Sequence, residues 1–446
     1  MTATIVSLAR IDLANAASDP EAAATVKRLL RRGGVPDRAV RDGARAIVDE
    51  VRVDPSAIRA LNERFGGGLA GGRLVIGRDE LAAAAERLDP EVRAALDQAI
   101  ANVRRFAESQ KPVSATTTVA PGIEIERRWA PLDRVGCYVP GGTAPYPSSL
   151  VMTVVPARVA GVGSVVVASP AGPDGTVDPI LLGAAGMLEV DALVVAGGAQ
   201  AIAALAFGLP REGIEPVDRI VGPGNAWVTA AKLELAGEVG IDMPAGPSEG
   251  MVLAAPPADP TRVAADLITQ AEHGMDSPAI LVTTDAAFAD DVETAVSALL
   301  AGASRRSILE HALAERGAIV LAPTLDAAVD FVNAYAPEHL SVDVDPLEET
   351  VGRLRHAGSL FVGPWAPESA GDYATGANHV LPTGGLARAS GPLAVETFGK
   401  YTQVQRVTRD GLASIRDSIR VLAEAEGLLA HRDAVEIRFR DEEQAR

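Results

Sequence analysis

The stretch SVVVASPAGPDGTVDPILLGAAGMLEVDALVVAGG, residues 164–198, contains two short runs rich in valine on either side of an alanine-containing segment. Each run is almost wholly apolar, as expected of a strand that is buried on both faces of a sheet. A strand, a helix of about a dozen residues and a second strand form a βαβ unit, in which the two strands are parallel. This stretch therefore predicts an α/β protein.

The same pattern continues on both sides of this stretch. Similar apolar runs occur at RVGCYV, RIVGPG, GMVLAA, AILVTTD, GAIVLA, LSVDV and SLFVG, between residues 134 and 363. The segment GIDMPAGPSEG, residues 240–250, is rich in Gly and Pro and separates the fourth run from the fifth. We therefore expect two parallel sheets, each covered by helices on both faces.

The flanking segments are expected to be helical. Residues 36–110 alternate charged and apolar residues at helical spacing, and apolar residues recur at helical spacing after residue 388. The expected fold is two Rossmann-like parallel-sheet domains with an N-terminal helical region and a C-terminal helical arm rather than a third sheet. The expected boundaries are an N-terminal segment at 1–35, a first α/β domain at 36–130 plus 245–387, a second at 131–244, and the arm at 388–446.

Composition narrows the class of protein. The 446 residues exceed the roughly 250 to 300 over which one hydrophobic core usually grows, so two or more domains are expected. The formal net charge of −18 repels polyanions, which argues against a nucleic-acid partner. The N-terminus lacks a secretory signal pattern, and ALVVAGGAQAIAALAFGL, residues 192–209, is short and broken by glycine. We expect a cytoplasmic protein without a membrane span.

Three glycine-rich loops follow strand-like runs: VPGGTAPYP (139–147), AGGAQA (196–201) and VGPGNA (221–226). The sequence contains neither G-x-G-x-x-G nor G-x-x-x-x-G-K-[ST]. Tight strand-to-helix turns need glycine in any βαβ protein, so each loop alone is explained by structure. Together, with Tyr138, Gln200 and Asn225, the loops are compatible with a cofactor cleft on the 131–244 domain.

The stretch ITQAEHGMDS, residues 268–277, ends a helix-like segment with an unusual set of polar groups. Gln270 and His273 are three residues apart and share a helix face, so an amide oxygen and an imidazole nitrogen can bind one metal ion. The alternative is a histidine at the end of a helix that is stabilised by the helix dipole.

Three further histidines occur in polar or glycine-rich settings: His339 in YAPEHLS, His379 in GDYATGANH with Asp372, and His431 in AEGLLAH. Glu338 precedes His339, and such a pair suits general-base chemistry because histidine titrates near neutrality and a carboxylate can accept a proton from water. The alternatives are surface histidines without a role and an Asp372 that only caps a turn.

Seven motifs in this order resemble the histidinol dehydrogenase family: YVPGGTAPYPSS, IVGPGNAWVTAAK, GEVGIDMPAGPSE, QAEH, NAYAPEHLS, ESAGDYATGANHVLPT and AEGLLAH. The resemblance covers about residues 100–438. It implies a zinc- and NAD-dependent four-electron oxidation of L-histidinol, through L-histidinal, to L-histidine in histidine biosynthesis. It also implies a homodimer with one Zn²⁺ per subunit.

Carried over residue by residue, the resemblance implies a complete site. The zinc ligands would be Gln270, His273, Asp372 and His431, the last contributed across the dimer interface. His339 resembles the base that takes the alcohol proton, and Glu338 the group that activates water against the aldehyde. The implied substrate contacts are the four zinc ligands together with Ser248, His339, His379 and Glu426, and the implied NAD contacts are Tyr138, Gln200 and Asn225.

Three positions depart from the commoner family pattern: Gly250, Gly274 and Trp227. Three other interpretations remain open. Cys137, the single cysteine, could act as a thiolate on the aldehyde, although its place in a strand-like run favours a buried apolar role. The enzyme could act on another small alcohol, or the protein could bind zinc or a metabolite without catalysis.

Overall fold

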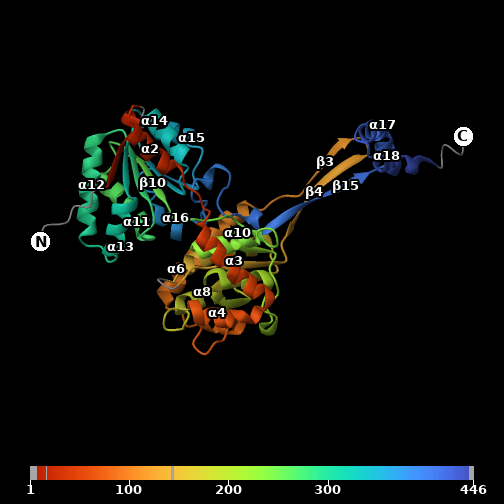
Figure 1. The fold of residues 1–446 in the computed structure, drawn as a ribbon, viewed down its shortest axis with the longest axis horizontal. Helices are drawn as coiled ribbons and strands as arrows, with labels where there is room; N and C mark the ends of the chain where they lie inside the picture. Colours follow the sequence, from red (N-terminus) through yellow and green to blue (C-terminus); the bar gives the residue numbers. More distant parts are fainter. Residues whose placement is uncertain (1–7, 17, 142–144, 441–446) are drawn as a thin grey trace. The chain divides into compact units, whose positions relative to one another are not determined.

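The computed structural model describes residues 8–16, 18–141 and 145–440. The chain divides into two compact units, Met1–Gln110 with Leu132–Phe398, and Lys111–Pro131 with Gly399–Arg446. The first unit contains two six-stranded sheets, here called sheet I and sheet II, and the second contains a three-stranded sheet with helices. Figure 1 labels many of these elements.

Sheet I has the strand order β2-β7-β6-β5-β8-β9. Its strands are β2 (Val75–Gly77), β5 (Arg134–Tyr138), β6 (Ser164–Ser169), β7 (Ala192–Val195), β8 (Arg219–Val221) and β9 (Gly240–Ile241). All neighbours are parallel except β2, which pairs antiparallel with β7 at the edge. The expected strands of this sheet are confirmed, and the short edge strands β2 and β9 are additions.

Sheet II has the order β1-β12-β11-β10-β13-β14 and is parallel throughout. Its strands are β1 (Ala9–Asp12), β10 (Gly250–Ala254), β11 (Ala279–Thr283), β12 (Ala318–Leu321), β13 (His339–Asp343) and β14 (Ser359–Val362). The five later strands lie where the apolar runs predicted them. The Gly- and Pro-rich segment 240–250 runs from β9 of sheet I to the first residue of β10 in sheet II.

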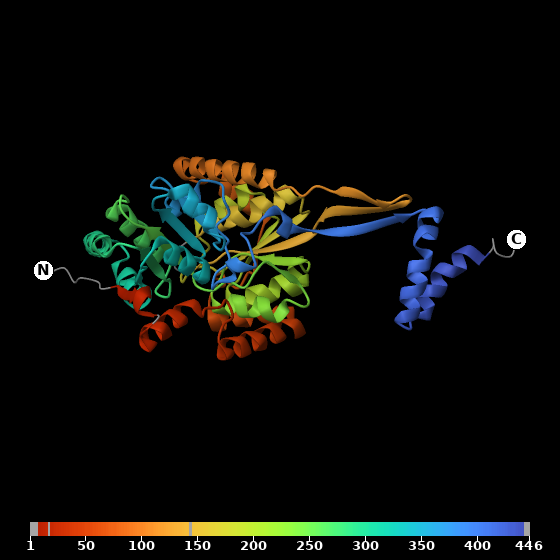
Figure 2. The same ribbon diagram turned by 90° about the horizontal axis from the view of Figure 1, so that it is seen from above.

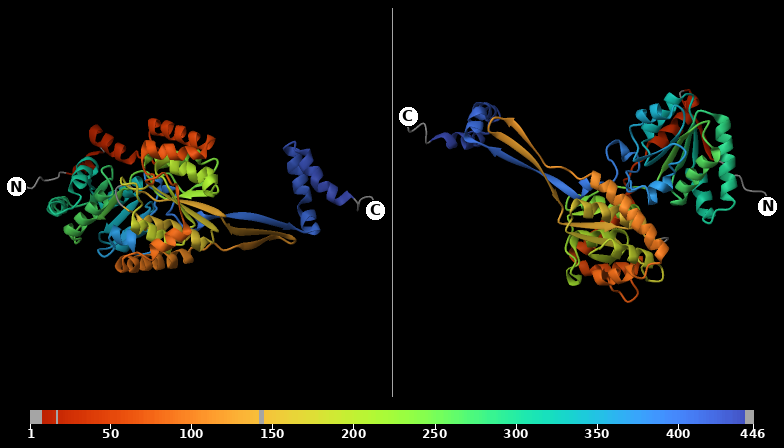
Figure 3. Two further views of the ribbon diagram at one scale, coloured as in Figure 1. Left: turned by 90° about the horizontal axis from the view of Figure 1, so that it is seen from below. Right: turned by 180° about the vertical axis from the view of Figure 1, so that it is seen from behind.

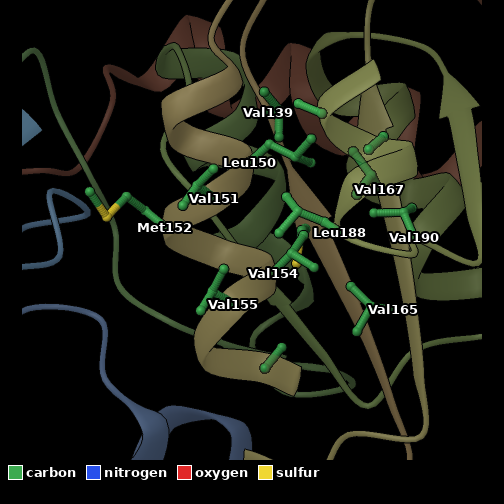
Figure 4. Close-up of a cluster of buried hydrophobic side chains, with 14 of the residues drawn as sticks. Val139, Leu150, Val151, Met152, Val154, Val155, Val165, Val167, Leu188 and Val190 are labelled. Atoms are coloured by element: carbon green, nitrogen blue, oxygen red, sulfur yellow. The ribbon is translucent and has the colours of Figure 1, made fainter. Parts of the chain in front are cut away.

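Helices cover both faces of sheet I. One face is covered by α3 (Arg38–Val53), α4 (Ile58–Phe65), α9 (Gly198–Phe207) and α10 (Ala226–Leu235). The other face is covered by α5 (Arg78–Ala85), α6 (Pro90–Ser109), α7 (Pro147–Ala160) and α8 (Pro179–Met187). On this second face, Leu150, Val154 and Val155 of α7 pack with Val165 and Val167 of β6 (Figure 4).

Sheet II is also a three-layer arrangement. Helices α11 (Pro260–Glu272), α12 (Ala286–Leu300) and α13 (Arg306–Arg316) cover one face. Helices α2 (Pro20–Leu30), α14 (Leu325–Tyr335) and α15 (Leu347–Arg353) cover the other. The short helices α1 (Leu13–Ala16) and α16 (Glu368–Tyr373) also belong to this unit, and α16 contacts α11.

The N-terminal helical region packs differently from the expected grouping. Residues 36–130 were expected to join 245–387, but α3 packs against α9 and α10 of sheet I (Figure 3, left). Ile47, Val48 and Val51 of α3 are buried there with Ile202 of α9. An amphipathic sequence shows which helix face is apolar but not which surface covers it, and the 1–35 segment meanwhile adds β1 and α2 to sheet II.

The second unit corrects the expectation of a purely helical arm. Strands β3 (Ala115–Ala120), β4 (Ile123–Pro131) and β15 (Gly399–Val407) form an antiparallel sheet of order β15-β4-β3, visible as adjacent ribbons in Figure 2. Strand β15, GKYTQVQRV, is mostly exposed and polar, so its sequence carries no buried-strand pattern. Helices α17 (Arg409–Ala425) and α18 (Leu429–Glu436) follow it, as the apolar spacing predicted.

Among the residues that the structure describes, no helix has the length and apolar character needed to cross a bilayer. The apolar segment 192–209 consists of β7 followed by α9, a buried strand and a buried helix.

Candidate active site

A cavity of about 520 Å³ is bordered by the carboxyl ends of strands in sheet I and by the amino ends of strands in sheet II. Sheet I contributes the segments after the carboxyl ends of β5 and β8, including Pro140 and Gly222–Asn225. Sheet II contributes Ser248, Glu338 and His339, at the amino ends of β10 and β13. Ligands of open parallel sheets usually bind at carboxyl ends where the strand order reverses. Sheet I follows this rule at β5 and β8, whereas sheet II presents the opposite edge.

Helix α11 returns antiparallel to the strands of sheet II and so brings its own C-terminal end to this edge. Gln270 lies in its last turn and His273 is its C-cap. The Gln270 side chain is 1% exposed, and its Oε1 atom finds no hydrogen-bond partner among the described residues. A Cβ atom at Gly250 would lie 2.7 Å from Gln270 Cγ, so the absence of a side chain at this unusual glycine makes room for the amide.

His339 is the first residue of β13 and Glu338 directly precedes it, and both are buried. The Glu338 carboxylate accepts hydrogen bonds from Ser248 Oγ at 2.8 Å and from the Glu249 backbone N–H at 2.9 Å. Its Oε2 atom is 3.6 Å from His339 Nδ1. Burial disfavours the charged carboxylate and raises the pKa of Glu338 to about 7, against the opposing effect of the neighbouring imidazole.

His339 is surrounded by carboxylates. Its Nδ1 lies 3.8 Å from Glu368 Oε1 and its Nε2 lies 3.9 Å from Asp372 Oδ1. Neither ring nitrogen has a hydrogen-bond partner within the described part of the chain. Burial lowers the pKa of His339, but the carboxylates of Glu338, Glu368 and Asp372 outweigh burial and raise it overall.

Glu368 belongs to this cluster, although it is not among the residues predicted from the sequence. It is 3% exposed at the start of α16, and its Oε1 atom is 3.4 Å from His273 Nε2. Burial lowers the pKa of His273, but the carboxylates of Glu368, Asp372 and Glu338 together outweigh burial and raise it to about 9. Glu368 and Asp372 are four residues apart in ESAGDY and share a helix face, a spacing that could have identified the pair.

His273, Glu368 and Asp372 place three potential ligand atoms within 4.8 Å of one another. Gln270 adds a buried amide oxygen without a partner. Imidazole nitrogen, carboxylate and amide oxygen together are a donor set that suits Zn²⁺. The residues of the first unit therefore fit a divalent cation, and the predicted partners Gln270, His273 and Asp372 come from two helices, α11 and α16, that contact each other.

His379 reaches the cavity from the segment after α16. Its Nδ1 lies 3.0 Å from the Asp372 backbone oxygen, and its Nε2 lies 3.3 Å from Ser149 Oγ of α7. Burial lowers the pKa of His379 to about 4, so the ring is neutral at physiological pH. A neutral ring that donates from Nδ1 to the carbonyl leaves Nε2 as an acceptor facing α7.

A second cavity, of about 410 Å³, lies at the carboxyl ends of the sheet I strands. Its lining includes all three residues expected to contact NAD, Tyr138, Gln200 and Asn225, together with the aromatic residues Phe65 and Trp227. The Tyr138 hydroxyl accepts a hydrogen bond from the Gly198 N–H at 3.3 Å. Asn225 lines both cavities, and the central part of the loop 139–147 lies outside the described residues.

The remaining predicted residues belong to the second unit. Glu426 is the C-cap of α17, His431 lies on α18, and both are exposed. Their contributions to substrate and metal binding therefore stay predictions.

Cys137 does not have the surroundings of a nucleophile. It lies on β5 and is 0% exposed, and burial raises the pKa of its thiol to about 12. A reactive cysteine needs a stabilised thiolate and access to its substrate. The structure therefore favours the buried apolar role over the thiolate mechanism.

Comparison with known proteins assigns the chain. A family model described as histidinol dehydrogenase matches residues 30–439. Histidinol dehydrogenase of Haloarcula marismortui is 47% identical over 407 residues, covering 90% of this chain and 94% of that protein. The enzyme of Leifsonia xyli subsp. xyli is 45% identical over 420 residues, covering 93% and 96%. The crystal structure of histidinol dehydrogenase from Elizabethkingia anophelis matches with a TM-score of 0.89 at 34% identity, covering 97% of this chain and 98% of that one.

These matches define the class, an NAD-dependent oxidoreductase. Within that class, the chain belongs to the histidinol dehydrogenase family. The expected resemblance and the expected α/β fold are thereby confirmed.

Proposed function

We propose that this protein oxidises L-histidinol to L-histidine through L-histidinal, in the biosynthesis of histidine. Each turnover consumes two NAD and one water and yields two NADH and three protons. The observation that carries the proposal is the adjacent pair Glu338 and His339, which lines one cavity together with His273 and Asp372. The Glu368 carboxylate lies close to both His273 and His339. This cavity shares Asn225 with the cavity that contains the expected NAD contacts.

The metal would be one Zn²⁺ per subunit, held by Gln270, His273, Asp372 and His431 of the partner subunit. The unpartnered buried Gln270 Oε1 and the close approach of His273 to Asp372 support this assignment. When bound, the ion would anchor the substrate through its amine and imidazole nitrogens and so orient the alcohol carbon. Ser248, His379 and Glu426 would supply the remaining substrate contacts.

In the first oxidation, His339 would act as the general base. A nitrogen of its buried ring accepts the hydroxyl proton of histidinol while hydride leaves the alcohol carbon for the nicotinamide of NAD. The surrounding carboxylates of Glu338, Glu368 and Asp372 stabilise the imidazolium that results, which agrees with the raised pKa of His339. The product of this step is L-histidinal with one NADH.

In the second oxidation, Glu338 would act as the general base. The ionised carboxylate takes a proton from water as the oxygen attacks the aldehyde carbon, and the hydrated aldehyde gives a second hydride to a second NAD. A pKa of about 7 suits a group that must accept a proton at neutral pH and later release it. Ser248 Oγ and the Glu249 N–H fix the carboxylate through their hydrogen bonds.

NAD would occupy the second cavity, with Tyr138, Gln200 and Asn225 as contacts. The Asn225 Oδ1 atom already accepts from the Trp227 and Val228 N–H groups, so its amide N–H₂ is the end that would bind the cofactor. The position of this cavity at the reversal of strand order in sheet I supports the assignment.

The working form would be a cytoplasmic homodimer. Several large apolar side chains of the second unit are exposed, a pattern that supports a covered surface. These are Val421, Leu422, Leu428, Leu429 and Ile437, with exposed fractions between 44% and 62%. The net charge of −18 argues against nucleic acid as a further partner.

Product stoichiometry tests the proposal. Zinc-loaded protein is mixed with limiting L-histidinol and excess NAD, and NADH is measured by absorbance. Two NADH per histidinol are expected. One NADH would indicate a simple alcohol dehydrogenase, and none would favour a protein that binds zinc without this catalysis. Growth of a histidine auxotroph that lacks this step, when it carries the gene, tests the substrate independently.

A further inference from the structure

A buried ion pair lies beneath the loop that separates the two cavities. Lys232 of α10 and Asp242, which follows β9, have side chains that are 2% and 1% exposed. Lys232 Nζ is 2.6 Å from Asp242 Oδ1. Because the ammonium is enclosed and paired, it cannot contact a substrate or cofactor directly, whereas Asp242 also borders the larger cavity. The proposed reaction leaves the pair without a role.

The pair binds both backbone groups of a single residue, Gly222. The Gly222 N–H donates to Asp242 Oδ2 at 2.7 Å, and Lys232 Nζ donates to the Gly222 carbonyl oxygen at 2.6 Å. Together with the ion pair these bonds form a closed ring through three residues. Gly222 has φ +110°, and a Cβ atom there would lie 2.1 Å from the Tyr138 carbonyl oxygen. The ring therefore surrounds the position at which the chain turns away from β8.

This turn positions the residues that face the ligands. Gly222, Gly224 and Asn225 line the larger cavity, and Asn225 also lines the smaller one. Asn225 is in turn the N-cap of α10, the helix that carries Lys232. The turn is thus held at Gly222 by the ion pair and at Asn225 by the helix, so a change in the pair moves a short, doubly anchored segment.

We propose that Lys232 and Asp242 are positioning residues that hold the Gly222–Asn225 turn in the shape that binds NAD. The identity of the ligand rests on the proposed function. Replacement of a buried ion pair by neutral groups often leaves stability little changed, because desolvation offsets the attraction between the charges. A role in stability alone therefore predicts that a neutral pair is adequate. A positioning role predicts that the neutral pair folds but binds NAD poorly.

A second ion pair, next to sheet I, serves as a control, and its side chains are more exposed, at 25% and 29%. Arg158 Nη2 lies 3.1 Å from Asp191 Oδ2 and also donates to the Glu189 carbonyl oxygen at 2.5 Å. Asp191 Oδ2 accepts from the Val165 N–H at 2.8 Å. As in the Lys232–Asp242 pair, the cation donates to a backbone carbonyl oxygen and the carboxylate accepts from a backbone N–H. This pair, however, contacts the start of β6, whereas the proposed NAD site is at the carboxyl ends of the strands.

The experiment compares Lys232→Met, the neutral double variant K232M/D242N, and the control pair R158M and R158M/D191N in the full-length protein. The double variant avoids an uncompensated buried charge, and its new amide oxygen can still accept from the Gly222 N–H. Three quantities are measured: the thermal midpoint, the Kd for NAD by calorimetry, and hydrogen exchange of the peptide containing Gly222–Asn225. The KM for NAD and kcat are measured with histidinol.

We expect K232M/D242N to raise the Kd and KM for NAD at least tenfold while kcat at saturating NAD changes less than threefold. Exchange in the Gly222–Asn225 peptide should accelerate, whereas the control variants should leave NAD affinity and this peptide unchanged. The proposal is wrong if K232M/D242N binds NAD like the wild type, or if its exchange matches that of the control. The exchange measurement needs no ligand, so a wild-type protein that failed to bind NAD would count against the proposed function and leave the positioning of the turn to be decided by exchange.

Discussion

The hydroxyl of Ser248 donates a hydrogen bond of 2.8 Å to the carboxylate of Glu338. Ser248 lies just before β10, and Glu338 lies just before β13. Strands β10 and β13 are direct neighbours, and Gly250 pairs with His339 in their register. The contact therefore depends on the central pairing of sheet II, which fixes the proposed water-activating group relative to the proposed base. Its chemical effect can be measured through the titration of Glu338.

The second oxidation should depend on pH through Glu338. Burial raises the pKa of Glu338 to about 7, and only the ionised form can accept a proton from water, so the rate with histidinal should fall as the pH falls through about 7. Ser248→Ala removes a hydrogen-bond donor to the ionised carboxylate of Glu338, which should raise the pKa of Glu338 and move the fall in rate to higher pH. The check is kcat against pH with histidinal as substrate. Ser248→Thr keeps a hydroxyl and serves as control, and an unshifted limb in Ser248→Ala contradicts the assignment.

Glu368→Gln should weaken zinc binding about tenfold or more. Glu368 is the carboxylate nearest to His273 Nε2, and groups that hold or orient a metal ligand typically change affinity by about 10 to 100-fold when replaced. The measurement is equilibrium dialysis against a competing chelator. Glu272→Gln, adjacent to His273 but outside the cluster, is the matched control. Equal affinities in the two variants would exclude a role for Glu368 at the metal.

NAD should quench the fluorescence of Trp227. The protein has three tryptophans, and Trp227 lines the second cavity whereas Trp129 lies in the second unit and Trp365 is 85% exposed. A W129F/W365F variant therefore isolates the signal of Trp227, and titration with NAD should reduce its emission. The complementary variant W227F should lose the NAD-dependent change. A full response in W227F would place NAD elsewhere.

Cys137→Ala should keep most of the activity in both oxidations. The thiol is fully buried with a pKa of about 12, so the folded protein should also resist a thiol reagent at pH 8 that modifies the unfolded chain. Loss of the buried sulfur is expected to cost about 1 kcal/mol of unfolding free energy. A selective loss of the aldehyde step in this variant would restore the thiolate mechanism.

Mixed dimers test whether His431 acts in the partner's site. Chains carrying His431→Ala or His339→Ala should each be inactive alone. If His431 is contributed across the interface, half of randomly mixed dimers are hybrids with one intact site of two, which gives about a quarter of wild-type activity. Absence of recovery after proven subunit exchange would place His431 in the site of its own chain.

The apolar runs predicted the interior of both sheets because a strand buried on two faces needs a continuous apolar sequence. Strand β1, with the sequence ARID, contains two charged residues, and the edge strands β2 and β9 have only three and two residues, so none of the three forms a continuous apolar run. Strand β15 is held by backbone hydrogen bonds to β4 and has a mostly polar, exposed sequence, so periodicity could not reveal it. The destination of α3 was also hidden, since its apolar face would fit either sheet.

Some residues of the site could likewise be predicted from the sequence, and others could not. The spacing of Gln270 and His273 predicted a shared helix face, and the family motifs placed Asp372, Glu338 and His339 around the same cavity. Glu368 was not predicted, because its approach to His273 depends on the contact between α11 and α16. The Lys232–Asp242 ring could not be inferred from sequence, because its central groups are the backbone N–H and carbonyl of Gly222.

The strand order β15-β4-β3 has a consequence for how the protein is made. The β3–β4 hairpin leaves the ribosome early, whereas β15, the third strand of this sheet, is translated only after nearly all strands of both parallel sheets. Throughout that interval the outer edge of β4 is unpaired, and exposed strand edges invite pairing with other nascent chains. Arg127 and Arg128 on this strand supply charge that discourages such mispairing until β15 arrives.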